Sequence, residues 1–492
     1  MAAHVLVFPF PAQGHINCML HFAAGLLDAG LHVTFLHTDH NRRRLGLASA
    51  AEAEAEAEAT SPRLRFLSVS DGLPDDHPRS AGDLALLVES LLATTSAVYR
   101  TLLASLCAGA RRDDGATITG LRDGFPPVTC VVADGMLPFA VDIAEEIGVP
   151  ALAFRTPSAC SFLAFLSVPR LVELGEVHPV PVGTADDLDA PVRGVPGVEG
   201  FLRRRDLPSF RRGHAKTTDP TLQIVAKFTA HNCRARALIL NTAVSLERSA
   251  VAHIAPHTRD VFAVGPLHAM FQAPAAGGAL WREDDGCTAW LDGHAERTVV
   301  YVSLGSFTVI SPEQFTEFLS GLVSAGYAFL WVLRPGMVEA NHNKEVLQDA
   351  IKAVGGNKAR VVEWAPQRDV LRHRAVGCFL THAGWNSTVE GVVEGVPLVC
   401  WPFFSDQRIN SRFVGAVWGN GLDMKDVCER AVVEGMVREA MESGELRGSA
   451  QALAQHVRRD IAEGGSSATE FKRLISFINQ LSLNAGHYTK PG

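Results

Sequence analysis

The chain has 492 residues, which is too long for one ordinary hydrophobic core, so two domains are expected. Its 47% hydrophobic and 20% charged residues are typical of a globular protein, and its formal net charge is −8. A mildly acidic chain without a basic block lacks the electrostatic footprint of a nucleic-acid-binding or anionic-membrane-binding protein. Its nine cysteines include no CxxC pair, which argues against a disulfide framework or a zinc site and favours reduced thiols.

No segment is predicted to be a targeting signal or a membrane span. Residues Met1–Pro11 are apolar but lack a basic n-region and a small-residue cleavage site, so they are interpreted as a first strand. The most apolar later run, Ala159–Val168, is too short and too interrupted to cross a bilayer. We therefore expect a cytoplasmic protein without a membrane span.

Short apolar runs bounded by turn residues recur along both halves of the chain. The first half contains His4–Phe10, His32–His37, Leu64–Val69, Val128–Ala133, Ala151–Phe154 and Ala237–Asn241. The second half contains Thr298–Leu304, Phe329–Leu333, Arg360–Trp364, Gly377–Leu380 and Leu398–Trp401. Helical stretches such as Leu20–Leu27 and Phe139–Ile147 separate these runs. Non-alternating runs divided by helices indicate parallel sheets covered on both faces, so an α/β fold with two doubly wound domains is predicted.

The boundary between the two domains is expected near Val264-Gly265-Pro266. The segment that follows, HAMFQAPAAGGALWREDDG, is rich in Gly, Pro and Ala and has neither a helical nor a strand period. We predict an N-terminal domain over residues 1–255, a linker region over 256–290 and a C-terminal domain over 291–460. The final segment, 461–492, contains an amphipathic helix near Ser467–Leu481 with no strand after it.

Two segments of unusual composition are interpreted as solvated loops. The stretch AEAEAEAEA at Ala51–Ala59 is of low complexity, and its composition predicts no function for it. The region Gly175–Pro208 is rich in proline and glycine. It contains Asp187 and Asp189, which imitate a DxD motif that binds a metal ion and a diphosphate in other architectures. No strand precedes these acids, so we expect solvated carboxylates and no metal site.

A candidate catalytic pair follows two predicted strands of the first domain. His15 stands in the turn PFPAQGHIN, after the first strand and immediately before a helix. Histidine is the side chain that most often serves as a general base at neutral pH. Asp134 follows the strand Val128–Ala133 and can orient the imidazole and stabilise its cation. The alternative is that both residues cap helices, and for Asp134 capping and catalysis do not exclude one another.

A second group of polar residues lies between Trp364 and Gln407. The strand Val376–Leu380 breaks at THAG, and WNST then opens a helix. A second strand, Leu398–Trp401, leads into PFFSDQ. In an open parallel sheet a ligand binds at the carboxyl ends of the strands, and the helix N-terminus there favours an anion.

The residues of this group suit a nucleotide sugar. Trp364 offers a flat face to a base, and Glu390 can accept hydrogen bonds from two ribose hydroxyls. The helix start, where a diphosphate would lie, is surrounded by His382, Asn386 and Ser387. For any one of these residues a capping or core role is the simpler interpretation, but such roles do not explain the whole ordered set.

Further polar groups follow neighbouring strands. Asp406 and Gln407 provide acceptors and an amide donor for sugar hydroxyls. Ser306, in the turn after the strand Thr298–Leu304, can donate to phosphate or sugar, and Gly305 lets the backbone approach closely.

The stretch Trp364–Gln407 resembles the plant secondary-product glycosyltransferase box of the family 1 UDP-sugar glycosyltransferases, at its usual length of 44 residues. It departs from the commonest form at Ala383, Gly391 and Glu394, none of which contacts the donor in the family. The resemblance implies a GT-B fold, in which two Rossmann-like domains face each other across a cleft, and it also implies the pairing of His15 with Asp134. It further implies that the C-terminal helix within 461–492 returns to the N-terminal domain, followed by a tail. It assigns to the donor site Ser306, Trp364, Ala365, Gln367, His382, Gly384, Trp385, Asn386, Ser387, Glu390, Asp406 and Gln407.

The resemblance implies inverting, metal-independent transfer of glucose from UDP-glucose to a hydroxyl or carboxyl group of a small lipophilic plant metabolite. Phenolics, terpenoids or iridoids, and hormones are the acceptors expected. Trp385 and Gln407 match the form associated with glucose. PFPAQGHINCML and GVEGFLRRRDLPSF look most like the branch that contains 7-deoxyloganetic acid glucosyltransferases. Apart from the UDP-sugar co-substrate no cofactor is expected, and neither a metal nor a nucleic acid; the protein is expected to be a monomer.

Two alternatives stay open within this fold. One is a different donor, UDP-galactose or UDP-xylose, and the other is a non-catalytic UDP-sugar-binding paralogue, against which His15 and Asp134 argue. A nicotinamide oxidoreductase is excluded because no GxGxxG follows a strand, and a P-loop NTPase because GxxxxGK[ST] does not occur. The expected lining of the acceptor pocket is Phe154–Pro169, Phe201–Phe210 and Leu73–Leu87, which is apolar and names no acceptor.

Overall fold

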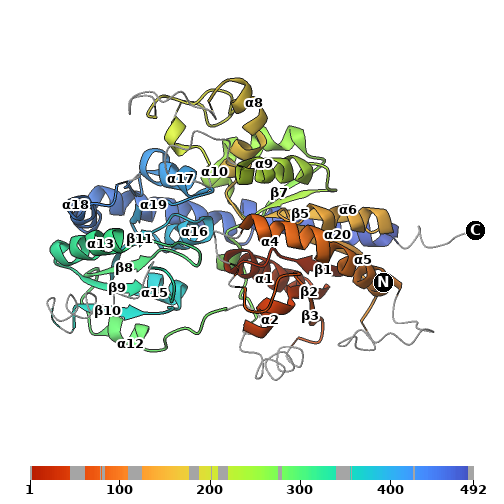
Figure 1. Ribbon diagram of the computed structural model, residues 1–492, viewed down its shortest axis with the longest axis horizontal. Helices are drawn as coiled ribbons and strands as arrows, with labels where there is room; N and C mark the ends of the chain where they lie inside the picture. Colours follow the sequence, from red (N-terminus) through yellow and green to blue (C-terminus); the bar gives the residue numbers. More distant parts are fainter. Residues whose placement is uncertain are drawn as a thin grey trace, which may run out of the picture. The chain divides into compact units, whose positions relative to one another are not determined.

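The computed structural model describes residues 3–44, 61–77, 79, 84–108, 125–176, 188–200, 202–208, 220–274, 280–338, 355, 357–424 and 427–485. The low-complexity stretch Ala51–Ala59 and Asp187 lie outside these residues. The chain divides into two compact units, each built around one sheet (Figure 1). Unit 1 comprises Met1–Phe162, Gln223–Leu280 and Asp460–Gly492, and unit 2 comprises Leu163–Leu222 and Trp281–Arg459.

The sheet of unit 1 has seven parallel strands in the order β3-β2-β1-β4-β5-β6-β7. They are β1 (His4–Phe8), β2 (His32–Thr38), β3 (Leu64–Val69), β4 (Cys130–Asp134), β5 (Ala151–Arg155), β6 (Leu238–Leu240) and β7 (Val261–Ala263). Every residue of β1, β4 and β5 is buried. The parallel, doubly covered sheet predicted from the unbroken apolar runs is therefore confirmed.

The division into units does not coincide with the predicted domain limits. Strand β7 lies inside the 256–290 region that we interpret as linker, but it pairs with β6 as the last strand of the first sheet. Three residues are too few to show a strand period, so the composition around them dominates the prediction. Residues 163–222 group with unit 2, where Nη2 of Arg203 lies 3.2 Å from Oδ2 of Asp423.

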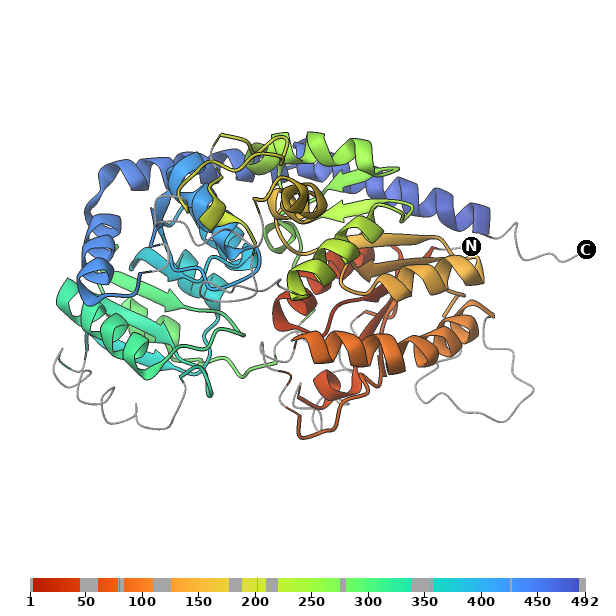
Figure 2. The same cartoon turned by 45° about the horizontal axis from the view of Figure 1, so that its top comes forward.

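Helices surround the first sheet, and the last helix of the chain is one of them (Figure 2). They are α1 (Gln13–Asp28), α2 (Asp39–Arg44), α4 (Leu84–Ser90), α5 (Ser96–Ala108), α6 (Pro138–Ile147), α7 (Ala159–Leu166), α9 (Pro220–Asn232), α10 (Val244–Ile254), α11 (Leu267–Met270) and α20 (Ser466–Ala485). In α20, Phe471 packs edge-on against Phe22, and Oγ of Ser482 lies 2.8 Å from Oγ1 of Thr129. The C-terminal helix thus packs on the sheet built by the first part of the chain.

Among the residues that the structure describes, one helical stretch, in unit 1, is long and apolar enough to cross a membrane by length and composition. It runs from Leu84 to Ala108 through α4, a π-helical turn at Leu91–Thr95 and α5. Its Tyr99 and Leu103 are fully buried, and the Tyr99 ring stacks on Phe8 of β1 with 5.3 Å between centroids. This single helix is weak evidence for a span, because a helix that packs its apolar side on a sheet meets the same criteria.

The sheet of unit 2 has six parallel strands in the order β10-β9-β8-β11-β12-β13. They are β8 (Val299–Ser303), β9 (Ala328–Val332), β10 (Ala359–Val362), β11 (Val376–Thr381), β12 (Leu398–Cys400) and β13 (Gly421–Asp423). The helices of this unit are α8 (Val168–Glu173), α12 (Cys287–Asp292), α13 (Pro312–Ala325), α15 (Gln367–Arg372), α16 (Trp385–Glu394), α17 (Gln407–Arg412), α18 (Arg430–Glu442) and α19 (Gly444–Ile461).

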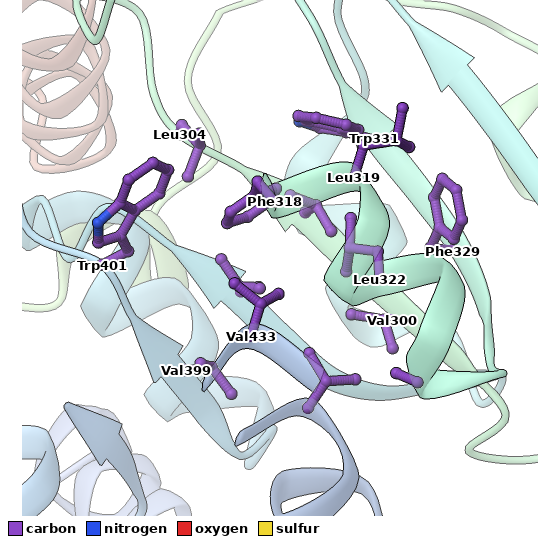
Figure 3. Close-up of a cluster of buried hydrophobic side chains, with 14 of the residues drawn as sticks. Val300, Leu304, Phe318, Leu319, Leu322, Phe329, Trp331, Val399, Trp401 and Val433 are labelled. Carbon is purple, nitrogen blue, oxygen red and sulfur yellow. The ribbon is translucent and has the colours of Figure 1, made fainter. Parts of the chain in front are cut away.

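The core of unit 2 fills the space between its sheet and the helix pair α13 and α18 (Figure 3). Trp331 of β9 and Trp401 after β12 both pack on Phe318 of α13, with ring centroids 5.3 and 5.1 Å apart. A Cβ on Gly321 would lie 2.6 Å from Cβ of Val433, so glycine is required where α13 crosses α18. This packing holds the strands whose carboxyl ends carry the predicted donor site.

Each sheet has a point where its strand order reverses. In unit 1 the chain moves outward in opposite directions from β1 and β4, and in unit 2 from β8 and β11. In open parallel sheets the ligand lies outside the carboxyl ends of the strands at such a point. His15 and Asp134 follow or end β1 and β4, whereas Ser306 and His382 follow β8 and β11.

Candidate active site

His15 lies in the first turn of α1, directly after β1, and its ring reaches the end of β4. Nδ1 of His15 lies 2.6 Å from Oδ2 of Asp134. Because an ionised carboxylate can only accept, this contact puts a proton on Nδ1 and leaves the lone pair of Nε2 for a substrate proton. The His15 side chain is 25% exposed and that of Asp134 only 1%. The structure thus brings the predicted pair together, with the imidazole as its accessible member.

Asp134 is buried and held as a carboxylate. Its Oδ1 accepts from the N–H of Met136 at 2.9 Å. Burial raises the pKa of Asp134, but the imidazole of His15, the Met136 N–H and the charge of Arg155 together hold that pKa below its usual value. Asp134 is therefore ionised at neutral pH and is suited to stabilise an imidazolium at His15.

Thr156 completes the surroundings of His15, although it was not among the residues predicted for the site. It follows β5, the neighbour of β4, and its Oγ1 lies 3.1 Å from Nδ1 of His15. The next helix, α7, is anchored by Glu247, which accepts from the N–H of Ala159 at 2.9 Å. Its position in the sequence could have indicated this role, because Thr156 follows a predicted strand, as Asp134 does.

In unit 2, His382 follows β11 and lies between two glycines. A Cβ on Gly305 or on Gly384 would lie 2.5 Å from Nε2 of His382, so a larger residue would displace the ring. Burial lowers the pKa of His382 to about 4, and its hydrogen bond to the Ser303 backbone only partly opposes this. A neutral imidazole therefore stands beside the turn that also carries Ser306, where the diphosphate is predicted to lie.

Helix α16 begins at this point and has an N-terminus suited to an anion. Its N-cap is Gly384, which has no side chain and so provides no cap of its own to the first turn. Asn386 is partly exposed and Ser387 is 8% exposed. Trp385 is 3% exposed and packs against Trp418, so its ring belongs to the core. Any contact of Trp385 with a donor is therefore a backbone contact.

Gln367 connects the two residues of α16 predicted to meet ribose and phosphate. Its Nε2 donates to Oε2 of Glu390 at 2.7 Å and to Oγ of Ser387 at 3.0 Å. Burial raises the pKa of Glu390 to about 7, although the bond from Gln367 and the charge of Arg368 lower it. The carboxyl predicted to bind ribose therefore titrates near neutral pH.

Trp364 has an aromatic partner in the region that the sequence analysis interprets as linker. The ring of Trp281 stacks on it, with 5.9 Å between centroids and 19° between planes. The N–H of Asp284 donates to the Trp364 carbonyl at 3.0 Å, and Oδ1 of Asp284 lies 2.6 Å from Nη2 of Arg360. Ala365 is buried beside this platform. Trp281 was missed because the composition around it is that of a loop.

Gln407 is the first residue of α17 and Asp406 its N-cap. Oε1 of Gln407 accepts from the N–H groups of Phe403 and Phe404 at 2.8 and 3.1 Å, so it closes the preceding turn. The amide nitrogen is the part of Gln407 left for a sugar hydroxyl. Oδ2 of Asp406 accepts from Asn410 at 2.8 Å.

Asp189, predicted to be a solvated acid, is exposed and is paired with arginines. Its two oxygens lie 2.8 and 2.7 Å from Nε and Nη2 of Arg205, and Oδ1 lies 3.3 Å from Arg203. Within the described part of the chain, no group of three or more His, Cys, Asp or Glu side chains is arranged to hold a metal ion. Metal independence stays a prediction.

Two Rossmann-like sheets with polar residues at both reversal points define a glycosyltransferase of the GT-B class. Residues 233–443 match the family model described as UDP-glucuronosyl and UDP-glucosyl transferase. A myricetin 3-O-rhamnoside 1,2-glucosyltransferase of Crocosmia x crocosmiiflora is 42% identical over 488 residues, which cover 98% of this chain and 97% of that protein. A 7-deoxyloganetic acid glucosyltransferase of Catharanthus roseus is 40% identical over 503 residues, which cover 98% of both.

Solved structures agree with this class. Os79 from O. sativa in complex with UDP superposes with a TM-score of 0.77 at 29% identity, covering 96% of this chain and 100% of that one. The chain belongs to the plant UDP-glycosyltransferase family. The family, the enzyme class and the GT-B fold predicted from the sequence are thereby confirmed.

Proposed function

We propose that the protein transfers glucose from UDP-glucose to a hydroxyl or carboxyl group of a small lipophilic plant metabolite, with inversion and without a metal ion. The observation that carries the proposal is the 2.6 Å contact between Nδ1 of His15 and Oδ2 of Asp134. A binding protein needs no such pair, because binding requires no proton acceptor held in one tautomer. The non-catalytic alternative is therefore not favoured.

The acceptor side of the reaction uses His15 as a general base. As the acceptor oxygen attacks the anomeric carbon, its proton passes to Nε2 of His15, and the ring becomes an imidazolium. Asp134 stabilises this cation through Nδ1–H without taking the proton. Attack from the face opposite the departing group inverts the configuration at the anomeric carbon. A carboxylic acid acceptor is already ionised at neutral pH and needs less of this help.

The donor side uses the residues of unit 2 to hold UDP and to stabilise the charge that develops as it departs. The bond between the anomeric carbon and the diphosphate oxygen breaks, and its electron pair leaves with UDP. The N-terminus of α16, which begins at Gly384, stabilises this charge together with Ser387 and Asn386 in place of a metal ion. Trp364 stacks on the base, and Glu390 accepts from the ribose hydroxyls.

Relatives support glucose as the sugar and a small molecule as the acceptor. The two relatives compared above are named as glucosyltransferases, one acting on a flavonol rhamnoside and the other on 7-deoxyloganetic acid. A complex of Os79 that contains a trichothecene is 30% identical to this chain, with a TM-score of 0.73. These proteins have chemically different acceptors, so the proposal commits to a lipophilic class and to no single compound.

The test is incubation with UDP-glucose and a panel of phenols, iridoids, other terpenoids and hormone acids, read by mass spectrometry. We expect a hexosyl adduct on at least one acceptor, with a β-linkage in its NMR spectrum. If an adduct forms with UDP-galactose or UDP-xylose but not with UDP-glucose, the proposed donor is wrong and that sugar nucleotide takes its place. If no adduct forms with any of these donors although the protein binds UDP, the non-catalytic UDP-sugar-binding alternative is favoured.

The proposal includes a monomer in the cytoplasm. All nine cysteines are free thiols in the structure, as a reducing compartment requires. Light scattering on the purified protein and fractionation of plant cells test these two points. A stable dimer, or enzyme retained in the membrane pellet after a salt wash, would contradict them.

A further inference from the structure

Tyr301 of β8 is a fully buried tyrosine whose hydroxyl reaches the donor site without belonging to the predicted set. Its ring stacks on Phe379 of β11, with 4.9 Å between centroids and 23° between planes. Its hydroxyl donates to Oε1 of Gln367 at 3.2 Å. Gln367 in turn donates from Nε2 to Glu390 and Ser387, so the four side chains form one hydrogen-bonded chain.

The direction of these bonds follows from the chemistry of the groups. Ionised Glu390 can only accept, so Gln367 must present its NH₂ group on that side. The amide oxygen then points the other way, where it needs a donor, and the Tyr301 hydroxyl supplies one. Ser387 accepts from the same NH₂ group, which leaves its own O–H hydrogen to donate. A turned amide would place its oxygen against the Glu390 carboxylate.

Tyr301 is suited to hold this direction because it is itself immobile. It is 1% exposed, and the sheet and the Phe379 ring fix its plane. Burial raises the pKa of Tyr301, so the phenol stays protonated and its proton is available to Gln367. The Tyr301 hydroxyl, which is also hydrogen-bonded by Ser303, donates to the Gln367 oxygen and so restricts the two-fold rotation that an amide otherwise has.

We infer that Tyr301 is a positioning residue for donor recognition, because it holds the Gln367 amide in the one orientation that prepares Glu390 for the ribose hydroxyls and Ser387 for the diphosphate. The inference rests on the proposed function, since it assigns ribose to Glu390. Without the Tyr301 hydroxyl, Gln367 is free to turn its oxygen toward Glu390 whenever that carboxyl is protonated. The ribose site is then occupied by an internal pair.

The test compares two ligands on the Tyr301→Phe variant by calorimetry at pH 7. We expect UDP to bind about five- to tenfold more weakly than to the unchanged protein, the effect of one misplaced hydrogen bond. We expect the affinity for 2′,3′-dideoxy-UDP, which has no ribose hydroxyls, to change less than about twofold, because this ligand uses only the Ser387 side of the orientation that Tyr301 maintains. If Tyr301 had only a structural role, Tyr301→Phe would weaken the binding of both ligands equally.

A matched control is Tyr99→Phe. Tyr99 is also fully buried, and its hydroxyl lies 3.4 Å from the Ala140 carbonyl within unit 1. Removal of the Tyr99 hydroxyl should leave the affinity for UDP and for dideoxy-UDP unchanged. A second variant, Gln367→Met, removes the amide through which Tyr301 acts, so adding Tyr301→Phe to it should weaken UDP by no more than about twofold.

The outcomes separate the inference from the proposed function. If the unchanged protein binds UDP and Tyr301→Phe weakens UDP and dideoxy-UDP alike, Tyr301 is structural and the inference is overturned. The inference is also overturned if the factors by which Tyr301→Phe and Gln367→Met weaken UDP binding multiply in the double variant. If the unchanged protein binds neither ligand, the proposed function itself is wrong. Thermal unfolding of each variant shows that the fold is retained before binding is compared.

Discussion

Nδ1 of His15 and Oδ2 of Asp134 lie 2.6 Å apart although 119 positions separate the two residues in the sequence. The contact follows from the sheet: β1 and β4 are neighbours, and Phe8 pairs with Ala133, so the residues after both strands emerge side by side. Unit 2 repeats this relationship, because β8 and β11 are also neighbours. Gly305, in the turn after β8, lies against the ring of His382, which follows β11. Both units therefore place their chemistry at the reversal point of a parallel sheet.

The first prediction concerns the base. His15→Ala should lower turnover on a phenolic acceptor by about 10²–10⁴, the usual share of general base catalysis. The affinity for UDP should stay nearly unchanged, because the residues predicted to bind UDP lie in unit 2. Turnover on an ionised carboxylic acid acceptor should fall less, since this acceptor has no proton to give up. Steady-state rates on a phenol and an acid, with UDP affinity by calorimetry, check all three statements.

Asp134→Ala should act through the same imidazole. The double variant should therefore be little slower than the slower single variant, as expected when one residue works through another. Losses that multiply would show that His15 and Asp134 act independently, and wild-type turnover of His15→Ala on a phenol would remove the base from the mechanism.

The strands were predictable from the sequence because buried parallel strands are unbroken apolar runs. The predicted Leu64–Val69 coincides with β3, and Ala151–Phe154 lacks one residue of β5. Strands β7 and β13 were not predicted, because an edge strand of three residues has too few side chains to show a pattern. Tertiary pairing, which no local window contains, determines both.

The site residues were predictable where they stand in a recognisable motif, as His15 and its partner Asp134 do, and not where a distant contact alone gives them a role. His15 and Glu390 belong to motifs with a chemical reason at each position. Thr156, Trp281 and Tyr301 have a role only through contacts with His15, Trp364 and Gln367, which lie 141, 83 and 66 positions away. Such contacts require the sheet order and the loop paths, and both come from the structure.

The second prediction is a pH dependence of donor binding. Burial raises the pKa of Glu390 to about 7 in the unliganded protein, whereas that of an unfolded chain is about 4.3. The stability that the protonated carboxyl contributes is fully present below the unfolded value and is lost as pH rises through 7. Ribose hydroxyls donate to the ionised form, so the affinity for UDP-glucose should rise from pH 6 to pH 8.

UDP-glucose is the proper ligand for this measurement, because its diphosphate has no group that titrates near neutral pH. Calorimetry across that range, with Glu390→Gln as the control, gives the comparison. The variant should bind more weakly at pH 8 and show little dependence on pH. An equally steep dependence in Glu390→Gln would mean that another group titrates.

The third prediction concerns metal ions. Transfer should proceed unchanged in EDTA, because the first turn of α16 with Ser387 supplies the stabilisation that a cation gives elsewhere. Initial rates with and without EDTA, followed by additions of Mn²⁺ and Mg²⁺, measure this directly. Loss of the rate in EDTA and its return with either ion would contradict the prediction and redirect attention to Asp189.

The fourth prediction is that Gln407→His alters both the stability and the donor preference of the enzyme. The amide oxygen of Gln407 closes a turn with two backbone N–H groups, and an imidazole cannot reproduce both bonds from the same position. At roughly 0.5–1.5 kcal/mol for each bond, a loss of about 1–3 kcal/mol in unfolding free energy is expected. Its amide nitrogen is also replaced, so the UDP-glucose to UDP-galactose rate ratio should fall. An unchanged ratio in a destabilised variant would leave Gln407 with only its structural role.

The last prediction concerns the tryptophan behind the base platform. Trp281 stacks on Trp364, and Asp284 fixes the Trp364 carbonyl, so this segment determines where the platform lies. Aromatic pairs of this kind contribute about 0.5–1.5 kcal/mol beyond their buried area, so Trp281→Ala should weaken UDP by about two- to tenfold. Trp281→Phe, which keeps an aromatic face, should recover most of that loss. Trp290, whose ring lies on His294 in the same unit, is the matched control, and Trp290→Phe should leave UDP affinity unchanged. The contact is only structural packing if Trp281→Ala lowers the unfolding temperature but binds UDP as tightly as the unchanged protein.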